Sequence, residues 1–304
     1  MPNQITHYYH GQEVLKRLDN NLRDIVNRYP YAYKMGSIGP DILFVLRETS
    51  GAKIRHYANE MQYLHMYEVF DSATKHLKKN FDECQLSYML GLLCHYAMDK
   101  RGHAYVNYFV EEVMPPHFPS EMQSALHPMM EAGLDEFVLL DHMNENPRKY
   151  KIADNFKSTL YERNKIGELY EQVINPVFGY TLSKGAMRFI LKITVMFFRL
   201  TTDRFGVKKK FFNYLENRKG VKKQMSSSIR PPHNKDGFDY MNRNRVNWRL
   251  VRNQNKLTDE SFDMVISDCV EQGVKYIEDF IAAVSKDKPL DKKNFQVNYE
   301  GVKV

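Results

Sequence analysis

Three residues that could bind metal follow one another at steps of four near residue 100. In a helix, His95, Asp99 and His103 would lie near one face, because four residues overshoot a full turn by only about 40°. At a rise of 1.5 Å per residue the two histidines would be roughly 12 Å apart, too far for both to reach one ion at about 2.1 Å. The spacing therefore predicts two metal ions, with Asp99 serving one or bridging both. Gly102 weakens the helix and could turn His103 off the row.

A structural role is the alternative for each of these residues. A lone histidine on a helix is more often exposed, or buried and hydrogen-bonded, than bound to metal. The row of three makes the two interpretations about equally good. Further candidate ligands elsewhere in the chain favour the metal.

The elements that must position these residues have the apolar spacing of helices. Helices are predicted for the ranges 12–29, 51–80, 82–112, 121–144, 153–178, 183–200 and 258–285. Short alternating apolar runs joined by hairpin turns are not found, so strand signals are scarce. The predicted fold class is all-α.

Two further stretches hold candidate ligands. Glycines and a proline precede Asp41 and favour a turn that could aim its carboxylate inward. His127 and Glu131 are separated by four residues and would share a helix face. Pro128 lies between them, which suits a helix whose first turn contains the proline.

Composition divides the chain into three parts. Residues 1–205 form the expected helical metal-binding core, 206–250 a basic loop or insertion, and 251–304 a C-terminal helix packed on the core with a polar tail. The stretch 188–210 mixes phenylalanines with basic residues and could form an amphipathic surface for membranes. A buried helix followed by a solvated basic loop is the simpler interpretation.

Charge and cysteine content bound the class of protein. The formal net charge of +7 favours an anionic partner, which could be a phosphate ester, a nucleic acid or an anionic lipid surface. Three cysteines without a CxxC spacing indicate neither a disulfide framework nor a thiolate zinc site. The start of the chain does not read as a signal peptide, and no segment is long and apolar enough to span a bilayer. A reduced, cytoplasmic location is expected, with peripheral membrane contact left open.

Taken in order, the candidate motifs resemble the zinc-dependent phospholipase C family. The closest match is the HYxxDxxxH run, which begins at His95, followed by the HxxxE pair that begins at His127. The resemblance covers roughly residues 5 to 140. It implies an all-helical fold with zinc ions in a cleft between helices.

The resemblance also implies a set of ligands, carried over position by position. One zinc would be held by Asp41, His56, His95 and Asp99, and a second by His103, His127 and Glu131. His7 and the shared Asp99 would hold a third. Two to three zinc ions are therefore the expected cofactors, with other divalent metals left open, and imidazole with carboxylate suits Zn²⁺.

The function implied is metal-dependent hydrolysis of a phosphoric ester. Hydroxide generated at the zinc ions would attack the phosphorus of a phosphodiester, with Asp41 orienting or deprotonating the water. Phospholipid is one substrate class. The alternatives are a nuclease or phosphomonoesterase with the same cleft, and a non-catalytic helical binding protein whose metal only holds helices together.

Overall fold

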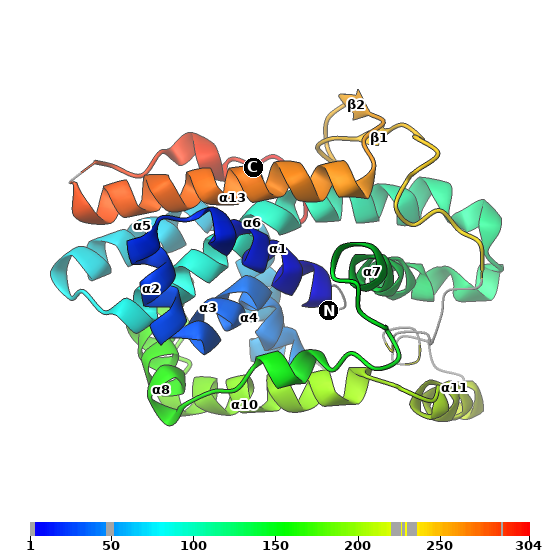
Figure 1. The fold of residues 1–304 in the computed structure, drawn as a ribbon, viewed down its shortest axis with the longest axis horizontal. Helices are drawn as coiled ribbons and strands as arrows, with labels where there is room; N and C mark the ends of the chain where they lie inside the picture. The colour runs from blue at the N-terminus through cyan, green and yellow to red at the C-terminus, as the bar shows by residue number, and fades with distance from the viewer. Residues whose placement is uncertain (1–3, 47–51, 220–225, 227–228, 230–235, 287) are drawn as a thin grey trace.

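The computed structural model describes residues 4–46, 52–219, 226, 229, 236–286 and 288–304, and these residues form an all-helical bundle (Figure 1). The α-helices are α1 (Gln4–Arg17), α2 (Asn20–Arg28), α3 (Pro30–Ile38), α4 (Ala52–Tyr63), α5 (Met66–Lys79), α6 (Glu83–Tyr108), α7 (Leu126–Phe137), α8 (Leu160–Leu169), α9 (Asn175–Val177), α10 (Lys184–Thr201), α11 (Val207–Lys219) and α13 (Phe262–Ser285). Short 3-10 or π turns are η1 (Gly39–Leu46), η2 (Phe109–Val113), η3 (Pro115–His117), η4 (Ser120–Ala125), η5 (Val138–His142), η6 (Ile152–Asn155), η7 (Tyr170–Ile174) and η8 (Lys292–Phe295). Strands β1 (Trp248–Arg249) and β2 (Leu257–Thr258) form one small antiparallel ladder. The predicted all-α class is confirmed.

Helix α6 lies at the centre and is buried on almost every side. It packs against α1, α3 and α13 (Figure 1), as expected for a helix without a polar face. The Asp82 side chain begins it by accepting a hydrogen bond from the backbone N–H of Gln85 at 3.0 Å. The helix continues through Gly102, so the predicted break there does not occur and His103 stays on the row.

Two glycines let α3 and α6 touch backbone to backbone. A Cβ on Gly36 would lie 2.1 Å from the carbonyl oxygen of Tyr88, and one on Gly91 would lie 2.0 Å from that of Tyr33. Only glycine allows this approach. The contact places the end of α3 and the following turn η1 against the middle of α6, where His95 stands.

The helix boundaries near the N-terminus differ from those predicted. The expected helix 12–29 is two helices, because the side chain of Asp19 accepts from the N–H of Leu22 and starts a new helix there. The expected helix 51–80 is also interrupted. His65 adopts a left-handed conformation with φ of 61°, which ends α4 and precedes α5.

The segment 206–250 is not a loop throughout, since it begins with helix α11. The Asp203 carboxylate accepts from the N–H of Lys209 at 2.8 Å and stabilises the first turn. Trp248, at the other end of the segment, is fully buried. Much of the expected basic run lies outside the described residues, including Lys222, Lys223 and His233.

The three cysteines, Cys84, Cys94 and Cys269, are buried and unpaired. Among the described residues, no helix combines the length and the apolar character needed to cross a bilayer.

Candidate metal centre

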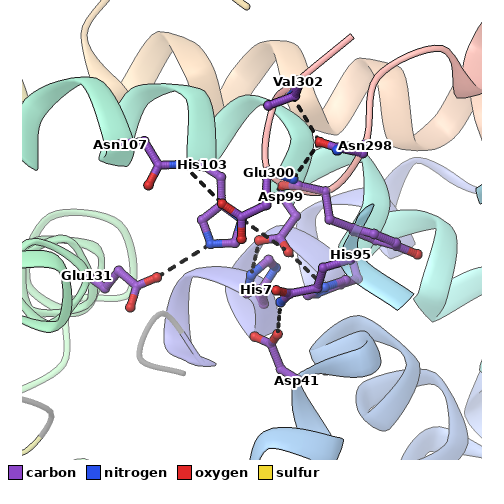
Figure 2. Close-up of polar contacts among 12 residues, drawn as sticks. His7, Asp41, His95, Asp99, His103, Asn107, Glu131, Asn298, Glu300 and Val302 are labelled. Carbon is purple, nitrogen blue, oxygen red and sulfur yellow. Dashed lines mark hydrogen bonds and ion pairs between the residues drawn. The ribbon is translucent and has the colours of Figure 1, made fainter. Parts of the chain in front are cut away.

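The first group of candidate ligands joins the N-terminal helix to the central one. Asp99 lies between two imidazoles: its Oδ1 is 3.1 Å from Nε2 of His7, and its Oδ2 is 3.0 Å from Nε2 of His95 (Figure 2). The three residues are buried, and their donor atoms lie within 4.8 Å of one another. A single cation could contact all three.

The orientation of His95 fits a metal ligand. Its Nδ1 lies 3.2 Å from the carbonyl oxygen of Ser37. A carbonyl can only accept, so Nδ1 carries a proton, and Nε2 is the ring nitrogen that faces the Asp99 carboxylate. Within the described residues, neither this Nε2 nor Oδ2 of Asp99 has a hydrogen-bond partner of acceptable geometry. Burial opposes protonation of His95, but Asp99 raises its pKa, so the site favours positive charge beside this carboxylate, which a proton on Nε2 or a bound cation can supply.

The second group comes from α6 and α7. His103 and His127 converge on Oε1 of Glu131, at 3.6 Å and 3.1 Å from their Nε2 atoms. Nδ1 of His103 lies 2.9 Å from the carbonyl oxygen of Tyr299, which fixes the ring as Ser37 fixes His95. Oε2 of Glu131 is buried without a partner among the described residues. These three residues also lie within 4.8 Å of one another.

Asp41 lies in η1 beside both groups and lines the same pocket as His103, His127 and Glu131. That pocket has a volume of about 400 Å³. The amide of Gln62 donates to Oδ1 of Asp41 at 3.3 Å and holds the carboxylate in place. Figure 2 shows Asp41, His7, His103 and Glu131 converging from four separate elements.

Gly39 is required for this arrangement. Its φ of 61° belongs to the left-handed region, and a Cβ there would lie 2.2 Å from the His95 ring. A side chain at this position would therefore displace either the turn that carries Asp41 or the imidazole.

His56 does not join either group, and here the expectation from the sequence is corrected. It lies in α4, its side chain is 69% exposed, and its Nε2 pairs with Glu60 at 3.3 Å. The neighbouring Tyr57 is buried and stacks on Tyr180. Burial of this tyrosine turns His56 toward solvent, and α4 presents Gln62 to the site instead.

His7 is positioned by an acidic residue one helical turn past Glu131, whose spacing allows either an exposed helix charge or a residue that orients a ligand. Asp135, on α7, is buried and accepts from the N–H of Ile5 at 3.2 Å and from the N–H and hydroxyl of Thr6 at 2.9 Å each. Its carboxylate satisfies the first turn of α1, where backbone N–H groups have no partner in the helix. The step of four from Glu131 to Asp135 was the available signal.

The C-terminal tail forms one wall of the site. Tyr299 offers its carbonyl to His103, and its N–H donates to the carbonyl of Gln62 at 3.2 Å. Glu300 lines the pocket and accepts from the amide of Asn107 at 3.2 Å. No sequence motif predicts these contacts, because they join residues more than 190 positions apart and two of the three use backbone atoms.

The buried charges perturb one another strongly. Burial alone would raise the pKa of Asp99, but His103, His95 and His7 hold it well below its usual range. Burial likewise opposes protonation of His103, yet Asp99, Glu300 and Glu131 raise its pKa well above normal. Both shifts mean that positive charge beside these carboxylates is favoured, and protonated imidazoles supply it in the absence of metal. Bound cations can provide it.

The residues present therefore fit zinc, since two His and one carboxylate per group leave coordination positions for water or substrate. A comparison with protein families supports the same conclusion. The family model described as zinc-dependent phospholipase C matches residues 6–180, more than half of the chain. The chain belongs to the zinc-dependent phospholipase C family. No curated protein and no solved structure matches it.

As a zinc-dependent phospholipase C family member, the chain has the domain of a zinc phosphoesterase. The family match contains helices α1 to α9 and both candidate ligand groups. It ends before α10, α11, α13 and the tail, so the contacts of Tyr299 and Glu300 lie outside the matched part.

Proposed function

We propose that this chain hydrolyses phosphodiesters, phospholipids among them, at zinc held by two neighbouring ligand groups. The first group is His7, His95 and Asp99, and the second is His103, His127 and Glu131. Bound zinc would supply Lewis-acid stabilisation of the phosphate charge and would lower the pKa of a water molecule. The observation that best supports this proposal is the orientation of His95 and His103 on α6. Their Nδ1 atoms face backbone carbonyls, and their Nε2 atoms face buried carboxylates.

Asp41 is the proposed base. Burial raises its pKa, the Asp99 charge raises it further, and His95 opposes the shift. A carboxylate with a raised pKa accepts a proton more readily, as a general base must. Asp41 would orient a water molecule toward phosphorus and take its proton as the new P–O bond forms. The ester P–O bond then breaks, and the leaving alkoxide takes up the proton that Asp41 accepted, which returns Asp41 to its carboxylate form.

The pocket gives the substrate its place. Asn59, Gln62 and Tyr63 of α4 line one part, opposite residues of α6 and α7. The amide and phenol groups can donate to phosphate oxygens, which carry no protons at neutral pH. This polar lining suits a phosphate headgroup, and Glu300 adds a negative charge that would favour a cationic substituent on it.

The experiment compares metal content per chain with hydrolysis of a chromogenic phosphodiester. Wild type should bind zinc at both groups and hydrolyse the ester. Asp99→Asn should lose at least about 100-fold in rate, because a direct ligand matters more than an outer partner, whose loss costs about 10–100-fold. His56→Gln is the matched control and should keep zinc and keep its rate within about two-fold, as an exposed side chain should.

Three results would contradict the proposal. Full activity after zinc is removed would exclude metal-dependent hydrolysis. Unchanged zinc content and rate in Asp99→Asn would show that the first group binds no metal. Unfolding on chelation, in a protein that hydrolyses no phosphodiester, would identify the metal as structural.

A further inference from the structure

Helix α10 exposes an apolar and basic stripe along one face. Phe189, Lys192, Met196 and Arg199 follow at steps of three and four and all are exposed, Phe189 to 56%. The sequence of α10 contains no acidic residue. The simpler expectation of a buried helix is therefore wrong for this face, while the opposite face, with Met187, Leu191 and Phe198, is packed in the core.

Helix α11 repeats the pattern directly after it. Val207, Lys210, Phe211, Tyr214 and Arg218 share one face and are exposed. Its one acidic residue, Glu216, is buried on the other side.

The two helices are fastened end to end. Nζ of Lys208 donates to the carbonyls of Arg199 and Thr202 at 2.9 Å and 2.8 Å, and so caps the end of α10. In Figure 1 both helices line the lower edge of the molecule, on the side opposite α13.

Lys192, Arg199, Lys210 and Arg218 form no ion pair with a carboxylate anywhere in the part of the chain that the structure describes. Phe205 lies between the two helices and is 76% exposed, with the guanidinium of Arg204 5.3 Å from its ring centre. Large apolar side chains exposed beside unpaired cations mark an interaction surface.

A groove adjoins the α10 stripe. It has a volume of about 620 Å³ and lies between α10 and the segment 153–158. Phe156, Phe189, Ile193 and Met196 give it an apolar lining, and the basic side chains of Lys157, Lys192 and Arg199 also border it. A ligand with an acyl chain beside a phosphate would fit this groove, because the acyl chain could contact the apolar residues while the phosphate contacts the basic ones.

We propose that the exposed faces of α10 and α11 dock the protein on membranes that contain anionic phospholipid. Amphipathic helices that carry phenylalanine with lysine and arginine insert their apolar side chains at the headgroup boundary while the cations meet anionic lipid. Helix α10 also packs against η1, which carries Asp41, so the docking helix is in direct contact with a segment that lines the metal pocket. The relevance of docking to turnover rests on the proposed function, but membrane binding itself does not.

The test is sedimentation with phosphatidylcholine vesicles, with and without phosphatidylserine, while headgroup release is measured in the same samples. Wild type should bind the anionic vesicles and lose that binding as salt rises. Lys192→Gln with Lys210→Gln should weaken partitioning about 25-fold, at about five-fold per cation. Phe189→Ser with Phe211→Ser should weaken it by about ten-fold or more. Hydrolysis of a soluble phosphodiester should stay at the wild-type rate in both, because neither pair belongs to the metal centre.

The matched control is Lys79→Gln with Phe81→Ser, an exposed cation and phenylalanine at the junction of α5 and α6. It should bind vesicles as wild type does. Equal binding to neutral and anionic vesicles, no binding at all, or equal loss in the control would overturn the proposal. So would a dimer that dissociates in the stripe variants, since a second copy would then cover this face. Binding without headgroup release would leave docking intact and count against the proposed function alone.

Discussion

At the scale of single residues, the metal centre depends on what lies behind each imidazole. His95 and His103 each turn Nδ1 toward a backbone carbonyl, and this contact decides which nitrogen is available for a metal. His56 instead points to solvent and pairs through Nε2 with Glu60. Residue type is the same in all three cases. The second contact of the ring distinguishes a candidate ligand from a surface histidine.

A histidine outside the centre gives stability a predictable pH dependence. Nε2 of His142 lies 2.7 Å from Oδ1 of Asp263; this hydrogen bond raises the pKa of His142 and lowers that of Asp263, with Asp141 adding to the first shift and Arg243 opposing it. Because the pKa of His142 is raised in the folded protein, its protonation stabilises the fold fully below about pH 6.5. This stabilisation is lost as pH rises through the pKa of His142 in the folded state. Because the pKa of Asp263 is lowered, its ionised carboxylate stabilises the fold above about pH 4, and this stabilisation is lost on acidification.

His142→Gln should therefore cost up to about 1 kcal/mol in the free energy of unfolding near pH 6 and close to nothing near pH 8.5. Urea unfolding at the two pH values checks this. Asp263→Asn is the partner control and should show the same difference. Equal destabilisation of His142→Gln at both pH values would mean that its ring packing against Tyr9, and not its charge, is responsible.

At the scale of elements, close helix contacts align the ligands. Gly36 and Gly91 let α3 touch α6, and the contact brings the Ser37 carbonyl to His95 and places η1, which carries Asp41, against α6. Gly273 on α13 approaches α1 in a similar way, since a Cβ there would lie 2.9 Å from Val14. The centre is therefore as rigid as the packing of the helices around α6.

Asp135 should link the position of α1 to metal affinity. Asp135→Asn removes the negative charge and one acceptor from the first turn of α1, which should cost about 1–3 kcal/mol in stability. His7 would lose its fixed position, and zinc affinity should fall about 10–100-fold. Thermal unfolding and a zinc titration measure the two effects. Asp141→Asn, at the outer end of the same helical segment, should leave zinc affinity unchanged, and an equal loss in both variants would refute the link.

At the scale of the whole molecule, the metal centre draws on both ends of the chain. The N-terminal helix supplies His7, and the tail closes over the site with Tyr299 and Glu300. The side chain of Asn298 holds the tail turn by accepting from the N–H groups of Glu300 and Val302 at 3.1 Å and 3.0 Å (Figure 2). The part after residue 180 thus completes a centre whose candidate ligands lie in the family-matched part.

Asn298→Ala should disturb the second ligand group more than the first. The turn would lose its buried acceptor at a cost of about 1–3 kcal/mol, and the Tyr299 carbonyl would no longer fix His103. Zinc should then bind the second group about 10–100-fold more weakly while the first group keeps its metal. Stepwise zinc titration resolves the two. Asn294→Ala, in the same tail but bonded to Asp279, is the control; loss of both zinc sites together in Asn298→Ala would show general unfolding instead.

The sequence by itself determined the all-α class, the row of His95, Asp99 and His103, and the pairing of His127 with Glu131, because helical periodicity is local and fixes which neighbours share a face. Tertiary structure alone decided that His56 faces solvent, that Asp135 anchors α1, and that Tyr299 and Gln62 support the ligands. Those outcomes depend on helix packing and on groups brought together from distant positions, and local spacing does not specify which distant partner a residue meets, even where it marks Asp135 as a candidate. The exposure of α10 was open for the same reason: its amphipathic pattern fits either a buried or a docking face until its neighbours are placed.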